Sequence, residues 1–259
     1  MTERIRTGRK GFTGSTGCEG STGRNESLLA ESTKDFHYSQ NDAEDLKKVF
    51  TPYYSQHHRI YHTTRHIVEM LQAAEAVCGN RTNNPWSLTI RTLPRHVVLA
   101  ILAHDAVYVP RSPEGANENQ SALLLRCLYD LNLLPSITTH TDIPKAQELI
   151  RLTADYMNNR KAQYTFDQAL ILNCDLYTLA SPSFDAFIVR QQCVAEEFFA
   201  PISEQANFLC SLVDSREKIF IDDWDGITDD QKELMTMWER VAQANIKKLL
   251  FRIECGMLK

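Results

Sequence analysis

The chain has 259 residues, of which 43% are hydrophobic and 24% charged, a composition typical of a globular protein with a sizeable core. A formal net charge of −5 without a basic stripe argues against a nucleic-acid partner. The apolar run Val97 to Ala103 is far shorter than the roughly 20 residues that span a bilayer, so no membrane role is expected.

The seven cysteines are widely scattered and include no C-x-x-C pair. Most lie among apolar residues of helical segments, which is typical of small buried side chains in a reducing compartment rather than of a disulfide framework. We therefore expect free thiols and a cytoplasmic protein.

Residues 1–40 are predicted to be a flexible, disordered tail of low complexity, and residues 41–259 to form the folded domain. The tail is rich in Gly, Ser, Thr and basic residues and has little to build a core. A targeting peptide is the alternative, but the segment has no apolar stretch or amphipathic stripe and contains Glu3 and Glu19.

From about Asn41 onward, helical patterns follow one another with short breaks. Residues 93–108 are apolar nearly all round between Val97 and Ala103, which predicts a central helix surrounded by the others. No alternating stretch is long enough to require a sheet, so the expected fold class is all-α. The predicted helices span residues 42–54, 63–77, 93–108, 117–131, 142–157, 166–179, 184–199, 203–221 and 229–251.

Four of the eight histidines, His57, His58, His62 and His66, lie within ten residues. His62 and His66 are four residues apart, so a helix would place both on one side, with His66 at the margin of an apolar stripe. A lone histidine there is most often a hydrogen-bonded core residue. Two of them, with His58 just upstream, favour a metal or phosphate site.

His104 and Asp105 end the most hydrophobic segment of the chain. Adjacent side chains diverge by about 100° on a helix, but they can converge on an ion beyond the helix end. The alternative is a buried ion pair or a helix cap, which is costly after seven apolar residues.

Two carboxylates complete the set of inward-facing polar groups. Asp175 has Ile171, Leu172 and Leu179 as its helical neighbours, so it points to the core side and forms either a salt bridge or a metal ligand. Glu118 begins a helix with an apolar stripe, where it is a general base, a partner of a ligand histidine, or a favourable charge at a helix N-terminus.

The order His66, His104-Asp105, Asp175 resembles the HD-domain superfamily of metal-dependent phosphohydrolases. Closest in pattern is the family described as predicted metal-dependent HD phosphohydrolases. The resemblance covers residues 42 to 250 and rests on these segments: Tyr54-Ser55, His58-Arg59, Tyr61-His62, His66-Ile67, His104 to Tyr108 with Pro110, Asn117-Glu118, Ser121-Ala122 and Asp175-Leu176.

The resemblance implies a helical HD-domain bundle in which His66, His104, Asp105 and Asp175 bind one divalent ion. Mixed N and O ligands suit Mn²⁺, Co²⁺, Fe²⁺, Ni²⁺, Zn²⁺ or Mg²⁺. The substrate-facing groups implied by the resemblance are His58, Arg59 and His62. Arg111 is a further expected substrate-binding residue, on the loop 109–116, which is expected to cover the substrate.

The activity implied is hydrolysis of a phosphate ester or anhydride, nucleotides included, by a metal-activated water, with Asp105, His62 and Glu118 as catalytic groups. The partner expected is therefore a small phosphorylated substrate; the sequence gives no indication of oligomeric state.

Two departures from the family pattern concern a second metal ion. Tyr156 stands where a histidine is usual, and Asn173 where a second acidic residue is usual, so both argue for a single ion. A catalytically idle scaffold that binds a nucleotide or a partner is the alternative function. An iron oxygenase on the same scaffold is a third, and the lack of a histidine at position 156 argues against it.

Overall fold

The computed structural model describes residues 37–79, 90–155, 163–215 and 218–258. Within them all regular structure is helical, apart from one isolated β-bridge between Tyr164 and Trp224, which confirms the all-α prediction. Most of the predicted tail, residues 1–36, lies outside this part of the chain. The helices, in chain order, are α2 (Gln40–Tyr54), α3 (Thr64–Val77), α5 (Arg95–Ala103), α6 (Ala116–Asp130), α7 (Asp142–Leu152), η1 (Thr153–Asp155), α8 (Phe166–Leu176), η2 (Tyr177–Ala180), α9 (Phe184–Glu197), α10 (Ile202–Ser215) and α11 (Asp229–Glu254).

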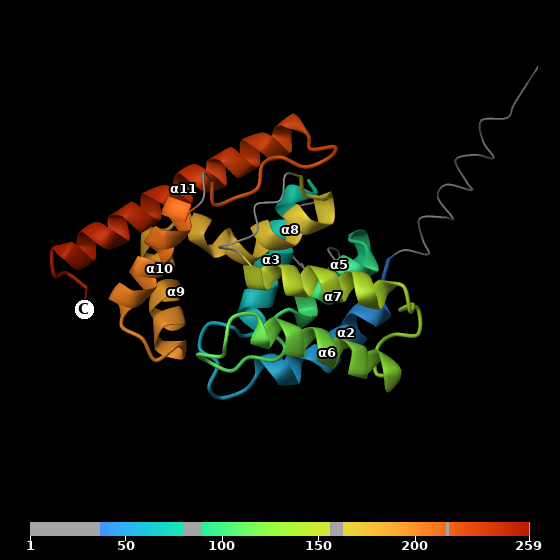
Figure 1. Cartoon of the computed structure of the whole chain (residues 1–259). Helices are drawn as coiled ribbons and strands as arrows, with labels where there is room; N and C mark the ends of the chain where they lie inside the picture. The colour runs from blue at the N-terminus through green and yellow to red at the C-terminus, as the bar shows by residue number, and fades with distance from the viewer. Residues whose placement is uncertain (1–36, 80–89, 156–162, 216–217, 259) are drawn as a thin grey trace, which may run out of the picture. The chain divides into compact units, whose positions relative to one another are not determined.

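Helix α5 lies at the centre of the folded unit, as the sequence predicts. Every residue from Val97 to Ala103 is 0% exposed, because α3, α6, α7 and α8 all pack against this helix. Helices α6 and α7 lie side by side, while α10 packs against both α9 and α11 (Figure 1). The long α11 also packs against η2, the 3-10 helix that follows α8. Helices α3 and α9 pack against η2 as well.

Three helices begin at capping boxes, in which a hydroxyl and a side chain three residues later each accept from the other's backbone N–H. Ser39 and Asp42 form the box that starts α2, which therefore begins two residues before the predicted position. Thr165 with Gln168 starts α8, and Thr228 with Gln231 starts α11. Asp142 is the first residue of α7, and its carboxylate accepts from Thr139 and pairs with Arg95.

The prediction of one helix over residues 93–108 is wrong at its C-terminal end. Helix α5 stops at Ala103, and residues 104–108 form a turn. The backbone of this turn is held by side chains of other elements: Arg59 donates to the Ala106 carbonyl, and Ser121 Oγ pairs with the N–H and carbonyl of Val107. These tertiary hydrogen bonds replace the helical ones, which local sequence preference cannot foresee.

Three other predicted helices also end early. The segment predicted as a helix to residue 179 becomes the 3-10 helix η2 after Leu176, where Asn245 donates to the Leu179 and Ser181 carbonyls. The helix predicted over residues 203–221 corresponds to α10, Ile202–Ser215. It ends earlier than predicted, since residues 218–221 are not helical. Helix α7 ends at Leu152 and continues as η1; Met157, its predicted end, lies outside the described residues.

The six cysteines in the described part of the chain are free, in agreement with the expectation of free thiols. Only Cys174 among them is buried, so the prediction of mostly buried thiols is wrong: Cys127 and Cys255 are exposed. No described helix combines the length and the apolar character needed to cross a membrane.

Asn173 fixes the chain before α11 through both ends of its amide. Its Nδ2 donates to the Ile221 carbonyl and its Oδ1 accepts from the Ile221 N–H, each at 2.8 Å, and the residue is 1% exposed. An aspartate could accept from Ile221 but could not donate to it.

Asn173→Asp is therefore expected to lower the free energy of unfolding by about 2–3 kcal/mol, because a carboxylate would face a buried carbonyl. Urea denaturation measures this, with Asn207→Asp on the exposed surface of α10 as the control. Equal stability of the two variants would contradict this role of Asn173.

Candidate metal centre

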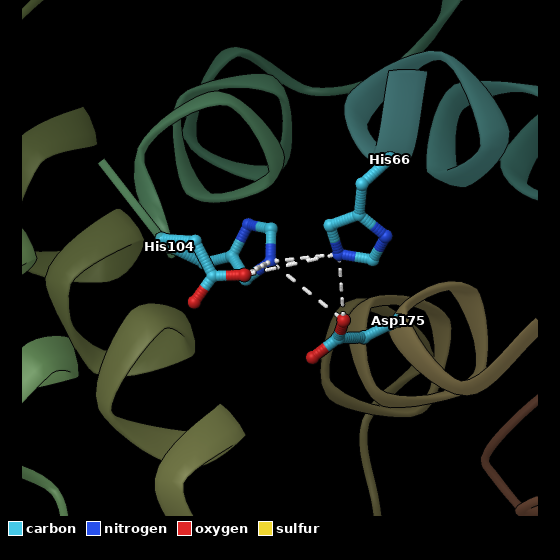
Figure 2. Close-up of side chains that lie close together, drawn as sticks. His66, His104 and Asp175 are labelled. Atoms are coloured by element: carbon cyan, nitrogen blue, oxygen red, sulfur yellow. Dashed lines mark hydrogen bonds and ion pairs between the residues drawn. The ribbon is translucent and has the colours of Figure 1, made fainter. Parts of the chain in front are cut away.

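Four side chains from three helices meet in the middle of the fold. His66 comes from α3, His104 and Asp105 from the end of α5, and Asp175 from α8. Each offers one ligand atom, and the four atoms lie within 4.8 Å of one another. Figure 2 shows the two rings and the carboxylates directed at a common point. The structure thus brings together the four residues that the sequence analysis gives as metal ligands.

The distances within the group are those of atoms that surround one ion. His66 Nε2 lies 3.3 Å from His104 Nε2 and 3.0 Å from Asp175 Oδ1. Asp105 Oδ2 lies 2.8 Å from His104 Nε2 and 3.8 Å from His66 Nε2. Ligand bonds of 2.0–2.2 Å at right angles place neighbouring ligand atoms about 3 Å apart, so the residues present fit a divalent ion.

The protonation pattern gives a second reason for a cation. His104 Nδ1 lies 2.9 Å from the Ile101 carbonyl, which only an N–H can satisfy. A neutral His104 therefore carries a lone pair on Nε2, and this lone pair faces His66 Nε2 and two carboxylates. Two carboxylates and the Nε2 atom of a neutral His104 thus converge, and a divalent cation, or a proton on His104, relieves their mutual repulsion.

The electrostatics of the side chains agree with this description. Burial disfavours the charged forms of His104, Asp105 and Asp175, but the attraction between the carboxylates and the imidazoles outweighs this effect on their pKa values. The neighbouring histidines hold the pKa of Asp105 far below its usual value and that of Asp175 at about 2, while Asp105 and Asp175 raise the pKa of His104 well above 6.5. The buried centre thus binds positive charge, whether protons or a metal ion.

A cavity of about 760 Å³ opens beside this group. Asp105, Asp175, His62 and Glu118 line one part of it. Helices α9 and α10 and the residues between them contribute mainly apolar side chains to the lining, together with Gln191, Glu204 and Gln205; the apolar ones are Val194, Phe198, Ala200, Phe208, Leu209 and Leu212. We call the part lined by Asp105, Asp175, His62 and Glu118 the polar end of the cavity, and the part lined by these six apolar side chains its apolar wall.

His62 is fixed at the polar end by an acidic residue that the sequence analysis missed. Its Nδ1 lies 2.8 Å from Glu197 Oε1, and its Nε2 lies 3.8 Å from Asp105 Oδ2. The ring stacks at 4.4 Å on that of Tyr108, with an angle of 31° between the planes. Burial lowers the pKa of His62, but Asp105 and Glu197 together raise it above 6.5.

Glu118 and Arg111 also line the cavity. Burial raises the pKa of Glu118, and the negative charges of Asp105 and Asp175 raise it further. The Glu118 carboxylate therefore interacts electrostatically with the candidate centre. Arg111 adopts a left-handed backbone conformation, with φ of 61°, and donates to the carbonyls of Phe198 and Phe199. Its side chain thus attaches the loop 109–115 to the end of α9.

His58 and Arg59 are not among the residues that line the cavity. His58 Nε2 lies 3.2 Å from the Tyr108 carbonyl. The buried guanidinium of Arg59 donates to Gln56 and to the carbonyls of His62 and Ala106. Both side chains therefore bind the backbone of the segments that carry His62 and Asp105, rather than lining the cavity.

Tyr156 and Asn173 are the two residues that depart from the family pattern. Tyr156 lies outside the described residues. Asn173 is occupied by the Ile221 backbone, and it is not part of the group of four ligands. Among the described residues, His66, His104, Asp105 and Asp175 form a group that could hold a metal ion.

Comparison with protein-family models, with curated protein sequences and with solved structures found no significant match for this chain. The structure agrees with the resemblance in two respects: the fold is helical, and a buried His/Asp group could hold a metal ion. Both are compatible with an HD-type site.

Asp175→Asn is expected to abolish the stabilisation that a bound divalent ion gives, because the amide removes one charge from the centre. We expect the melting temperature of the wild-type protein to rise with Mn²⁺ or Zn²⁺ and to fall with a chelator. Elemental analysis and thermal melts test this.

Asp167→Asn is the matched control. Asp167 lies two turns earlier on the same helix and pairs with His96 at 2.7 Å, outside the group of four. If Asp175→Asn kept the same metal content as this control, the assignment of Asp175 would be wrong.

Proposed function

We propose that the protein is a metal-dependent phosphohydrolase that cleaves a small phosphate ester or anhydride. The observation that carries this proposal is the group of four convergent side chains at the end of a cavity of about 760 Å³, a volume within the range of small-molecule sites. A divalent ion held by His66, His104, Asp105 and Asp175 would supply Lewis acidity, polarising a phosphoryl oxygen and lowering the pKa of a water molecule.

The chain's own residues carry the protons of the reaction. Hydrolysis forms a bond from phosphorus to the water oxygen and breaks the bond from phosphorus to the leaving oxygen. In our proposal Glu118 accepts the proton that the water loses, and His62, protonated on Nε2, gives a proton to the leaving oxygen. Transfer of a proton from Glu118 back to His62 restores the site. Asp105 orients the attacking water, which lies across the phosphorus atom from the leaving oxygen.

The apolar wall supports a substrate with an organic part of low polarity. Val194, Leu209 and Leu212 line the cavity from α9 and α10. Burial of apolar groups there contributes about 25 cal/mol per Å² to binding. In this proposal the phosphoryl group lies at the polar end and the leaving alcohol against this wall.

A non-catalytic module that binds a nucleotide or another partner is the alternative. The same centre would then hold the metal and the phosphate without turnover. Bound metal and bound phosphate ester in the absence of any product would favour this alternative.

Asp105→Asn tests the proposed hydrolysis. We expect at least a roughly 100-fold loss of kcat toward any phosphate ester that the wild-type protein cleaves, because Asp105 contacts both the centre and His62. Release of inorganic phosphate from a panel of mononucleotides, sugar phosphates and aryl phosphates is the measurement. Undiminished turnover by the variant would refute the proposed site.

Phe208→Ala tests the apolar wall. Phe208 lines the cavity and is 45% exposed, so its removal leaves the core intact. We expect KM to rise about 5- to 10-fold for esters of apolar alcohols and to change little for small polar ones, consistent with about 1 kcal/mol of lost contact. Phe251→Ala on α11, where the side chain is 58% exposed and lies outside the cavity lining, is the control. An equal effect of the two variants would contradict the assignment of the wall.

A further inference from the structure

We infer that Glu197 is a positioning residue that selects the tautomer of His62 and directs its Nε2 at the cavity. This inference rests on the proposed function for its catalytic meaning, but the contacts that carry it are independent of any reaction.

Glu197 makes four hydrogen bonds to a single segment of the chain. Its Oε2 accepts from the backbone N–H groups of Ile60, Tyr61 and His62, at 2.7, 2.5 and 3.0 Å. Its Oε1 takes the bond from His62 Nδ1. The two oxygens thus have separate tasks: one fixes the backbone before α3, and the other fixes the imidazole ring.

The position of Glu197 is unfavourable for a charge without compensation. It is 1% exposed, and it is the last residue of α9, where the helix dipole disfavours a negative charge. Although burial raises its pKa, the bonds from His62 and from the Tyr61 and His62 amides hold that pKa at about 2, below the usual 4.5. The group is therefore a carboxylate at neutral pH and can only accept.

An acceptor at Oε1 requires a proton on His62 Nδ1. In the neutral ring Nε2 is then the free acceptor, and it is the nitrogen that lies 3.8 Å from Asp105. The ring also packs against that of Tyr108, with the two centroids 4.4 Å apart. Nε2 can therefore take up a proton and return it at the polar end of the cavity without reorganisation of the ring.

Glu197→Gln gives a sharp test, because an amide cannot accept at both of its ends. The three backbone N–H groups need the amide oxygen, so the NH₂ group would face His62 Nδ1 and force the proton to Nε2. We expect ¹⁵N NMR of the metal-free protein, recorded where the ring is neutral, to show the Nδ1–H tautomer of His62 in the wild type. In Glu197→Gln the Nε2–H tautomer is expected, and in the exposed control Glu196→Gln the wild-type tautomer.

The kinetic test separates positioning from structural support. For a substrate that the wild type hydrolyses, Glu197→Gln is expected to lower kcat roughly 10- to 100-fold with little change in KM or metal content. In the background of His62→Asn, which keeps an N–H near the place of Nδ1 but has no Nε2, the further change Glu197→Gln is expected to have no effect on kcat. Glu196→Gln should match the wild type throughout.

Two results would overturn the inference: a wild-type His62 in the Nε2–H form, or the same tautomer in the wild type and in Glu197→Gln. A further loss of kcat in the double variant would show that Glu197 acts by supporting the fold rather than through His62. If no phosphate ester is hydrolysed by the wild type, the proposed function fails, while the tautomers still decide the role of Glu197.

Discussion

The turn after α5 determines where the candidate centre lies. A helix that is 0% exposed from Val97 to Ala103 ends just before two polar residues, His104 and Asp105, which belong to the turn that follows it. Had the helix continued, His104 and Asp105 would diverge; because it stops, Asp105 Oδ2 lies 2.8 Å from His104 Nε2. His66 and Asp175 approach this turn from α3 and α8, which pack against each other as well as against α5.

The turn is held by side chains of other segments that bind its backbone, and not by the candidate ligands themselves. Arg59 and Ser121 bind the Ala106 carbonyl and the Val107 peptide, and Asn117 pairs with both backbone groups of Val109. This arrangement matters because burying the carboxylates of Asp105 and Asp175 opposes folding unless histidine protons or a cation neutralise them. The scaffold therefore supplies the stability that the centre itself lacks, as is common at functional sites.

The sequence allows the candidate metal ligands to be predicted, but not the residues that hold the surrounding segments in place. His104, Asp105 and Asp175 interrupt strongly apolar helical patterns, so their burial and the need for compensation can be predicted. Glu197 could not be found in the same way, because Glu196 beside it has the same chemistry and an exposed side chain, and the partners of Glu197 lie about 135 residues earlier in the chain. The early end of α5 was equally hidden, since it depends on side chains from other segments and not on local preference.

The last turn of α9 and the residues just after it serve two segments that are far apart in the sequence. Glu197 binds the segment that carries His62, while the carbonyls of Phe198 and Phe199 receive the guanidinium of Arg111 from the loop at the edge of the cavity. Any movement of these three consecutive residues therefore displaces the ring of His62 and the cavity edge together.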